Sequence, residues 1–234
     1  MKNLKIIILS ILITITINAK EPLIANQIQG KLNIINGASA ECVMHYFYKS
    51  SGWTQLEGEI GRNGIDGLYL KKKSNHISEL LVTESKWNKS KLSRSGKNKT
   101  IKQMSQEWII NTIIKLEKRH PSSIYNTLKN LIKHNQYRAR LFTLKPKKNN
   151  KIQIAIFKIQ NKGLKSFTME KYRELKAIDL NAPKNDFETN ILHAYNSCRE
   201  KYLKKYIPIL TEQNIKTLLE DNYLQKRDII KLLP

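Results

Sequence analysis

Alternating apolar and polar residues in two adjacent stretches constrain the fold of this chain more than any other feature. Within residues 63–87, NGIDGLYLKKKSNHISELLVTESKW, the alternation predicts one strand over 65–71 and a second over 77–86. Successive side chains of a strand point to opposite faces of the sheet. By this rule Asp66 continues the apolar row of the first strand and Glu84 that of the second. Two acids are therefore expected at the ends of inward-facing rows.

Carboxylates at such positions have two explanations, and the pattern leaves both open. Strand ends can fray into solvent, and both acids would then simply be exposed. A carboxylate that faces a core is instead costly unless it is paired or binds a metal ion. The second explanation predicts a functional site, to which Lys86 would belong because it shares the predicted face of Glu84. An exposed Glu84–Lys86 ion pair alone would contribute only about 0–1 kcal/mol.

The charge of the chain favours a polyanionic partner. Its 234 residues include 42 Lys+Arg and 19 Asp+Glu, which gives a formal net charge of +23. So strong a positive field attracts nucleic acid first and an anionic membrane surface second. Residues 86–102 contain no acid, and we expect this loop to hold phosphates, with a solvated mobile loop as the alternative. Its basic residues are Lys86, Lys89, Lys91, Arg94, Lys97, Lys99 and Lys102.

The N-terminus has the pattern of a secretory signal peptide over residues 1–19. Lys2 and Lys5 form a basic start, residues 6–17 are apolar, and Ala19 offers a small residue for cleavage. The apolar stretch is short of the roughly 20 residues that span a bilayer. We therefore expect an exported protein, periplasmic or secreted, with no stable membrane span after cleavage. An uncleaved membrane anchor is the alternative.

Cysteine and histidine patterns suggest little chemistry of their own. Cys42 and Cys198 are the two cysteines, and they could form a disulfide in an exported protein or remain as buried thiols. Neither has the Cys or His spacing of a zinc site. The histidines are scattered, and no G-x-S-x-G motif is present for a serine hydrolase.

The remaining periodicity predicts an α+β protein. Residues 20–37 are expected to be a linker that leads into a short strand at 30–37, and Ser39 to cap the first helix. The Asn63-Gly64 dipeptide predicts a tight turn between the first two strands of a meander. The other predicted elements are helices at 38–51, 100–119, 122–135, 168–177, 186–206, 211–220 and 225–233, and strands at 53–60, 139–145 and 151–159.

This order of elements and its acidic residues resemble the PD-(D/E)XK nuclease superfamily, and within it the restriction-endonuclease-fold toxins. NGIDGLY stands where those proteins carry an aspartate strand, and TESK stands at their E-x-K motif. GASAE is similar to the opening helix with its acid, and GKNKTIKQMSQEWI to the helix that follows the meander. The resemblance covers roughly residues 30–160. The sequence departs from the family pattern at Ile65, where a proline often precedes the aspartate.

The resemblance implies a domain organisation. A restriction-endonuclease-like core of a helix, a three-strand antiparallel meander, a second helix and further strands is expected over residues 38–160. Residues 161–234 are expected to form a helical C-terminal region, and residues 20–37 to lead into the core.

The resemblance also implies roles for individual residues. Asp66 and Glu84 would hold Mg²⁺ or Mn²⁺, with help from the Ser85 carbonyl, because hard oxygen ligands suit these ions. Lys86 would orient or deprotonate the attacking water. Three further assignments extend the site. Glu41 would be an outer or second-metal ligand, a position that Glu57 or Glu59 could also fill, and Gln103 would position water or the phosphate backbone.

A structural periplasmic or surface protein, whose charge reflects only the base composition of the genome, is one hypothesis compatible with the sequence. Two further functions from different classes are also compatible with it. The first is an exported metal-dependent nuclease that hydrolyses phosphodiester bonds, in DNA rather than RNA, as a toxin or effector with an immunity protein as partner. The second is a non-catalytic basic protein that binds nucleic acid or an envelope surface. Convergence of Asp66, Glu84 and Lys86 on one another is the feature that separates them.

Overall fold

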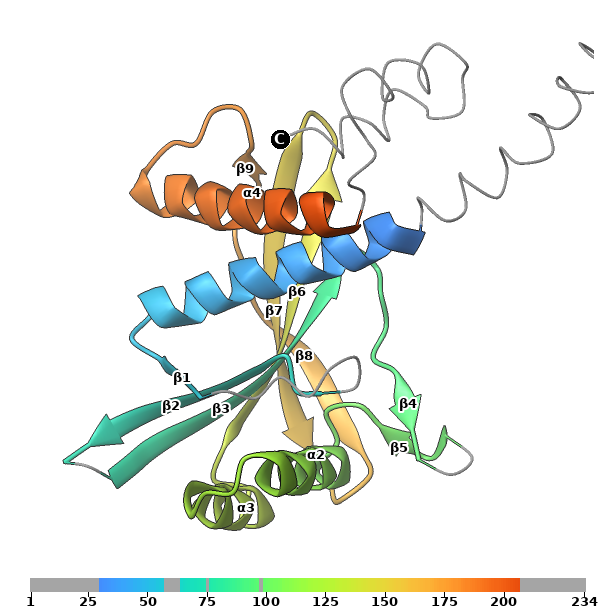
Figure 1. Cartoon of the computed structure of the whole chain (residues 1–234), viewed down its shortest axis with the longest axis vertical. Helices are drawn as coiled ribbons and strands as arrows, with labels where there is room; N and C mark the ends of the chain where they lie inside the picture. The colour runs from blue at the N-terminus through green and yellow to red at the C-terminus, as the bar shows by residue number, and fades with distance from the viewer. Residues whose placement is uncertain (1–29, 57–63, 75, 97–98, 207–234) are drawn as a thin grey trace, which may run out of the picture. The chain divides into compact units, whose positions relative to one another are not determined.

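The computed structural model describes residues 30–56, 64–74, 76–96 and 99–206. Over these residues the chain is an α+β protein with four helices and one large mixed sheet (Figure 1). No helix among them is long and apolar enough to cross a membrane. The predicted signal peptide, the Asn63 half of the predicted turn and the two predicted helices after residue 210 lie outside the described residues.

A seven-stranded sheet forms the centre of the fold, and its first three strands, at 54–56, 67–73 and 76–87, form the expected antiparallel meander. Its order is β1-β2-β3-β6-β7-β8, and β9 also pairs with β7. Every pairing is antiparallel except β3 with β6, which is parallel. The strands are β1 Thr54–Leu56, β2 Gly67–Lys73, β3 His76–Trp87, β6 Arg138–Lys147, β7 Lys151–Asn161, β8 Phe167–Glu174 and β9 Ile178–Asp179.

The parallel pairing of β3 with β6 requires a long crossover between the two strands. This crossover contains a small antiparallel hairpin, β4 Arg94–Ser95 with β5 Ile101–Lys102, and then two helices. Helix α2 covers Gln106–Arg119 and helix α3 covers Ile124–Lys133. Figure 1 shows α2 and α3 together on one side of the sheet. The loop predicted to bind phosphate is therefore the first part of the crossover.

Each face of the sheet carries its own apolar core, as the alternation predicts. Leu80 and Val82 of β3 pack with α2 and α3 in one cluster. Leu81 lies in the other cluster, with residues 40–48 of the N-terminal helix and residues 191–195 of α4 Asp186–Tyr206. The predicted alternation is thus confirmed for the apolar residues of β3, and the same alternation puts Glu84 and Lys86 on the α2 face.

The N-terminal helix begins earlier than expected. The structure is helical over residues 30–50, so the strand predicted at 30–37 and the Ser39 cap are wrong. Leu32 and Ile35 are both buried, and their spacing of three residues is helical. The short GKLNIING segment has a glycine at each end. It resembles a strand between two turns only if Leu32 and Ile34, two residues apart, are taken as the apolar face in place of Leu32 and Ile35.

The helix predicted at 168–177 is also wrong, because this segment forms strand β8. Its register with β7 runs from Asn161↔Phe167 to Ala155↔Glu174. After Phe167 every residue of β8 is exposed, including Met169 and Tyr172. An edge strand that is exposed on both faces has no alternating pattern to read, and backbone pairing with β7 decides its conformation. The sheet therefore continues past residue 160, where only helices were expected.

The described chain divides into two compact units by its contacts. The larger unit, Ser39–Tyr195, contains the whole sheet. Of the described residues, the other unit contains 30–38 and 196–206. Within that second unit Arg199 is buried, and its Nη1 donates to Asn36 Oδ1 at 2.8 Å.

Candidate active site at the β2–β3 strand ends

Asp66 and Glu84 meet at one end of the antiparallel β2–β3 pair. Gly67 is paired with Thr83, so one further step in the same register sets Asp66 opposite Glu84. Side chains at directly opposite positions have Cβ atoms about 4.5–5.5 Å apart. The pairing of the two strands therefore brings the two acids close together although they are far apart in the sequence. This register produces the convergence of Asp66 and Glu84 that was predicted.

Ser85 orients the Asp66 carboxylate. Its backbone N–H donates to Asp66 Oδ2 at 2.8 Å, and its hydroxyl donates to the same oxygen at 3.0 Å. Both bonds use the same oxygen of the carboxylate. The role that the structure gives Ser85 is thus to hold Asp66. Its predicted role as a carbonyl ligand stays a prediction.

Glu84 is almost fully buried, with 2% of its side chain exposed. Its Oε1 accepts from Lys86 Nζ at 2.5 Å and from Gln103 Nε2 at 2.5 Å. Its Oε2 is buried and has no hydrogen-bond partner among the described residues. A buried acceptor without a partner costs free energy comparable to a lost hydrogen bond, so this oxygen is where a proton or a cation would be stabilised.

Burial raises the pKa of both acids. The pKa of Glu84 lies well above its ordinary value, because burial disfavours the charged form and the negative charge of Asp66 adds to this effect. Burial also raises the pKa of Asp66, and the Ser85 N–H and the charge of Lys86 oppose that shift. Two carboxyl groups with raised pKa values at one place are typical of functional sites. The explanation by frayed, exposed strand ends does not apply to Glu84.

Gln103 connects the basic hairpin to Glu84, although it is not on a helix. The predicted helix start at Thr100 is wrong, since α2 begins at Gln106 after the N-cap Ser105. The Gln103 Oε1 accepts from Ser93 N at 3.0 Å and from Ser93 Oγ at 3.2 Å, which turns its NH₂ group toward Glu84. Its backbone N–H also donates to Ser93 O at 2.9 Å. The side chain thus joins the base of the hairpin to the acid.

The conformation of Met104 explains why the apolar periodicity wrongly predicts that Gln103 lies on a helix. Met104 is fully buried and has a φ of +71°, in the left-handed region that side chains other than glycine rarely adopt. This residue interrupts the helical pattern between Gln103 and α2, while its side chain stays in the core beside Trp108. Backbone conformations of this kind are found at functional sites more often than elsewhere.

The basic loop presents most of its charge to solvent. Lys89, Lys91, Arg94 and Lys99 are exposed, and Lys97 lies outside the described residues. Lys102 differs from them because it is half-buried, with its Nζ 4.2 Å from the centroid of the Phe167 ring. The exposed four can move toward a polyanion, whereas Lys102 contributes to packing between the hairpin and β8.

Glu41 does not join the two strand acids in a three-ligand group. It is half-buried on the N-terminal helix, and its charge acts on Tyr69. In the part of the chain that the structure describes, no three His, Cys, Asp or Glu side chains lie in a metal-binding cluster. The two alternatives for this position, Glu57 and Glu59, are outside that part. The assignment of Glu41 therefore stays a prediction.

Behind the two acids lies a group that the sequence did not suggest. Gly67 lies so close to the Tyr69 ring and Thr83 that a Cβ on it would be 2.5 Å from Tyr69 Cε2 and 2.3 Å from Thr83 Oγ1. The Tyr69 hydroxyl is 2.5 Å from His45 Nδ1, and burial lowers the pKa of this histidine to about 4. A glycine directly after Asp66 is the signal that could have suggested such a close approach.

The donor set fits a hard divalent cation. The two carboxylates supply oxygen ligands, and Glu84 Oε2, which has no hydrogen-bond partner among the described residues, is an available acceptor. A site with two carboxylates suits Mg²⁺ or Mn²⁺, which take oxygen ligands and keep several waters. A cation would also replace the repulsion between the acids by attraction.

Neither cysteine is a free thiol. Cys42 and Cys198 are both disulfide-bonded, which decides between the two states that the sequence leaves open.

Comparison of the chain with protein-family models, with curated proteins and with solved structures finds no match.

Proposed function

We propose that this protein is an exported, metal-dependent nuclease of the PD-(D/E)XK type that hydrolyses phosphodiester bonds. The observation that carries the proposal is the pair of opposed acids, Asp66 and Glu84, with Lys86 bonded to Glu84 and a buried carboxylate oxygen left without a partner in the described part of the chain. These residues have the types and the order of the family motif. A strand end with no function would have no reason to bury an unsatisfied carboxylate.

The order of elements supports the same proposal. A helix precedes a three-strand antiparallel meander, α2 follows it, and the next long strand, β6, joins the sheet beside β3. This order agrees with the one that the family resemblance implies for residues 38–160 and so supports the proposal. The α+β class with a mixed sheet is common to many folds, so the site supports the family more strongly than the fold does.

Each residue has a distinct task in the proposed reaction. Asp66 and Glu84 would hold Mg²⁺ or Mn²⁺, and Ser85 would keep Asp66 turned toward the ion. A bound metal of this kind polarises a phosphoryl oxygen and lowers the pKa of water. Lys86, with 17% of its side chain exposed, is the group that can reach solvent, orient the attacking water and offset negative charge on the phosphate. Gln103 would fix the position of Glu84.

DNA of another cell is the proposed substrate. The exposed cations of the hairpin follow directly after the strand with Glu84 and Lys86, where they could contact phosphates on both sides of the cleaved bond. The disulfide-bonded state of both cysteines supports export, because disulfides persist in oxidising compartments. A secreted nuclease that attacks DNA would act as a toxin or effector, and its producer would need an immunity protein.

Plasmid cleavage by the purified protein tests the proposal. We expect nicking with Mg²⁺ or Mn²⁺, none with EDTA, and a loss of at least about a hundredfold in Glu84→Gln and in Lys86→Ala. Glu117→Gln is the matched control, because Glu117 is a partly exposed acid that is paired with Lys129 on the α2–α3 surface. Cleavage that persists in EDTA, or equal rates in Glu84→Gln and Glu117→Gln, would contradict the proposal.

The Glu84–Lys86 ion pair also favours a second candidate, a non-catalytic basic module that binds nucleic acid. In this case the pair would only neutralise charge at a strand end. Well-folded protein that binds DNA with a steep dependence on salt, and cleaves neither DNA nor RNA with either metal, would favour this candidate.

A further inference from the structure

A small cavity lies on the other face of the sheet from Glu84 and Lys86. It has a volume of about 130 Å³ and is bounded by the end of the N-terminal helix and by strands β3, β6, β7 and β8. Leu81, which faces the N-terminal helix, lies in its wall, so the cavity is on the α4 side of β3. Its wall includes three arginines, Arg138, Arg140 and Arg173, together with the aromatic residues Tyr48, Trp53 and Tyr172.

Arg140 is a buried cation in the wall of this cavity. It is 9% exposed, its Nη1 donates to Ala139 O at 2.9 Å, and its guanidinium lies 4.9 Å from the centroid of the Tyr172 ring. In the described ranges no carboxylate forms an ion pair with Arg140 or Arg173. A buried charge is costly unless it is paired.

The acids that act on these arginines neutralise only Arg138 directly. Glu79 Oε2 is 2.5 Å from Arg138 Nη2 at the cavity rim. Glu170 is paired with Lys158 at 3.5 Å and acts on Arg140 only through its longer-range charge. Three arginines therefore surround a space in which one acid neutralises one of them, which leaves an excess of positive charge.

Tyr48 adds an unused donor to the same cavity. Its side chain is 5% exposed, and its hydroxyl oxygen is buried with no hydrogen-bond partner in the described part of the chain. Burial raises the pKa of this tyrosine, so the hydroxyl keeps its proton and can donate. Buried hydroxyls are almost always hydrogen-bonded in folded proteins. A ligand with acceptor oxygens would satisfy this hydroxyl and neutralise Arg140 at once.

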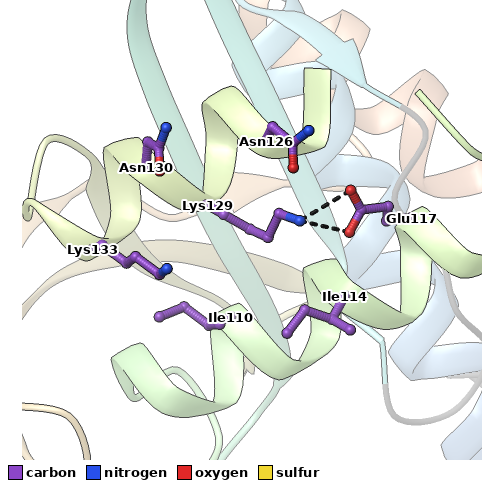
Figure 2. Close-up of a pocket in the computed structure, with 7 residues that line it drawn as sticks. All are labelled: Ile110, Ile114, Glu117, Asn126, Lys129, Asn130 and Lys133. Carbon is purple, nitrogen blue, oxygen red and sulfur yellow. Dashed lines mark hydrogen bonds and ion pairs between the residues drawn. The ribbon is translucent and has the colours of Figure 1, made fainter. Parts of the chain in front are cut away.

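The cavity between α2 and α3 provides a contrast. It is larger, about 510 Å³, and also has charged residues in its wall. Figure 2 shows that Lys129 points at Glu117, and the two are paired at 2.7 Å. This cavity contains its own counter-ion and has no buried donor without a partner among its wall residues, all of which the structure describes. The smaller cavity, with Arg138, Arg140 and Arg173 in its wall, is called the arginine cavity below, and it differs on both points.

We propose that the arginine cavity is a second site, which binds one phosphate group through Arg140, Arg173 and the Tyr48 hydroxyl. Planar guanidinium groups bind phosphate oxygens in pairs, and a dianion matches the excess charge better than a carboxylate does. The volume agrees with a single group, since a cavity of roughly 150 Å³ holds a benzene molecule. Whole small-molecule ligands occupy roughly 300–1,000 Å³. The rest of a nucleotide would lie outside, beside Tyr172, which is 61% exposed and offers a ring for stacking.

Isothermal titration of the whole chain with inorganic phosphate, without metal, tests this proposal. We expect saturable binding that is at least about tenfold weaker in Tyr48→Phe and in Arg173→Ala, since a hydrogen bond to a charged ligand is lost. Both variants are expected to fold, because one keeps the ring and the other changes an exposed residue. Arg119→Ala, which removes the same charge from the exposed end of α2, is the control and should bind as the wild type does.

A second comparison distinguishes the source of the phosphate. A 5′-phosphorylated oligonucleotide is titrated beside the same oligonucleotide with a 5′-hydroxyl, and beside a nucleoside 5′-monophosphate. Tighter binding of the phosphorylated oligonucleotide would assign the site to a nucleic-acid end. Binding of free phosphate and mononucleotide, with no difference between the oligonucleotides, would assign it to a small metabolite. No saturable phosphate binding, or equal affinity in all four proteins, would overturn the proposal. Neither measurement depends on cleavage, so this result and that of the plasmid assay are separate.

Discussion

Replacement of Asp66 by asparagine should stabilise the metal-free protein at neutral pH. The opposed positions after β2 and in β3 place the Cβ atoms of the two acids about 5 Å apart. Two negative charges at a separation of that order repel by about 3 kcal/mol at an effective dielectric of 20. Lys86 and the Ser85 donors offset part of this repulsion. The amide oxygen of an asparagine can still accept the two Ser85 bonds, and the side chain carries no charge. We therefore expect a gain of about 1–3 kcal/mol in the free energy of unfolding.

The free energy of unfolding should depend on pH in a definite direction. The pKa values of Asp66 and Glu84 are raised in the folded state, so the folded protein binds more protons than the unfolded chain above pH ~4. The free energy of unfolding must then fall as the pH rises from about 4 through the raised folded-state pKa values. Below pH ~4 both states are protonated and the effect disappears. Removal of one titrating acid should flatten this fall.

Urea denaturation in EDTA at several pH values between about 4 and 8 measures the effect. Asp179→Asn is the matched control, because Asp179 is a partly exposed aspartate that pairs with Lys151 at 3.8 Å, and its loss should change stability by less than about 0.5 kcal/mol. If Asp66→Asn follows the same pH profile as the wild type, or is less stable at the alkaline end of that range, the two carboxylates do not repel each other and the reasoning is refuted. Added Mg²⁺ should stabilise the wild type more than the variant.

Three further changes test other parts of the structure. Gly67→Ala should lower the free energy of unfolding by about 1–3 kcal/mol, because the new methyl group would collide with the buried Tyr69 ring and Thr83. Thermal denaturation measures this loss. Gly163→Ala, at a position with space but a positive φ, is measured beside it to distinguish the collision from backbone strain. Gln103→Ala should cost about 1–3 kcal/mol in urea denaturation, since Ser93 and Glu84 both lose a buried partner; an unchanged midpoint would mean that the bridge is not formed. Reduction of the protein with dithiothreitol should lower the free energy of unfolding by about 2–4 kcal/mol, and two thiols detected before reduction would contradict the disulfide-bonded state of the cysteines.

The parts of the fold that follow a strong pattern could be predicted from the sequence. Strands β2 and β3 lie within one or two residues of their predicted bounds, and α4 begins at the predicted residue 186 and continues to 206, the last residue that the structure describes. The edge strand β8 could not, because an element exposed on both faces has no apolar rhythm. The parallel pairing of β3 with β6 could not be predicted either, because it depends on how the crossover packs and no local sequence pattern indicates it.

The candidate site divides in the same way. Alternation predicts that Asp66, Glu84 and Lys86 share a face, and the hairpin register then brings the acids together. The periodic pattern does not predict which residues contact these acids and give them their unusual environment. Ser85 acts through its own N–H and hydroxyl, and Gln103 acts from an irregular turn before the helix.

The two sites on the sheet differ in which charge lacks a partner among the described residues, and this difference decides what each can bind. At the β2–β3 strand ends a buried carboxylate oxygen lacks a partner, and the missing group must be a cation or a proton. In the arginine cavity a buried guanidinium lacks an acid, and the missing group must be an anion. A nucleic acid that carries its own metal counter-ions offers both groups in one ligand. In the proposed binding of a nucleic acid, the chain's excess of positive charge would supply only the general part of the affinity, and these two places are where the structure can make that affinity specific.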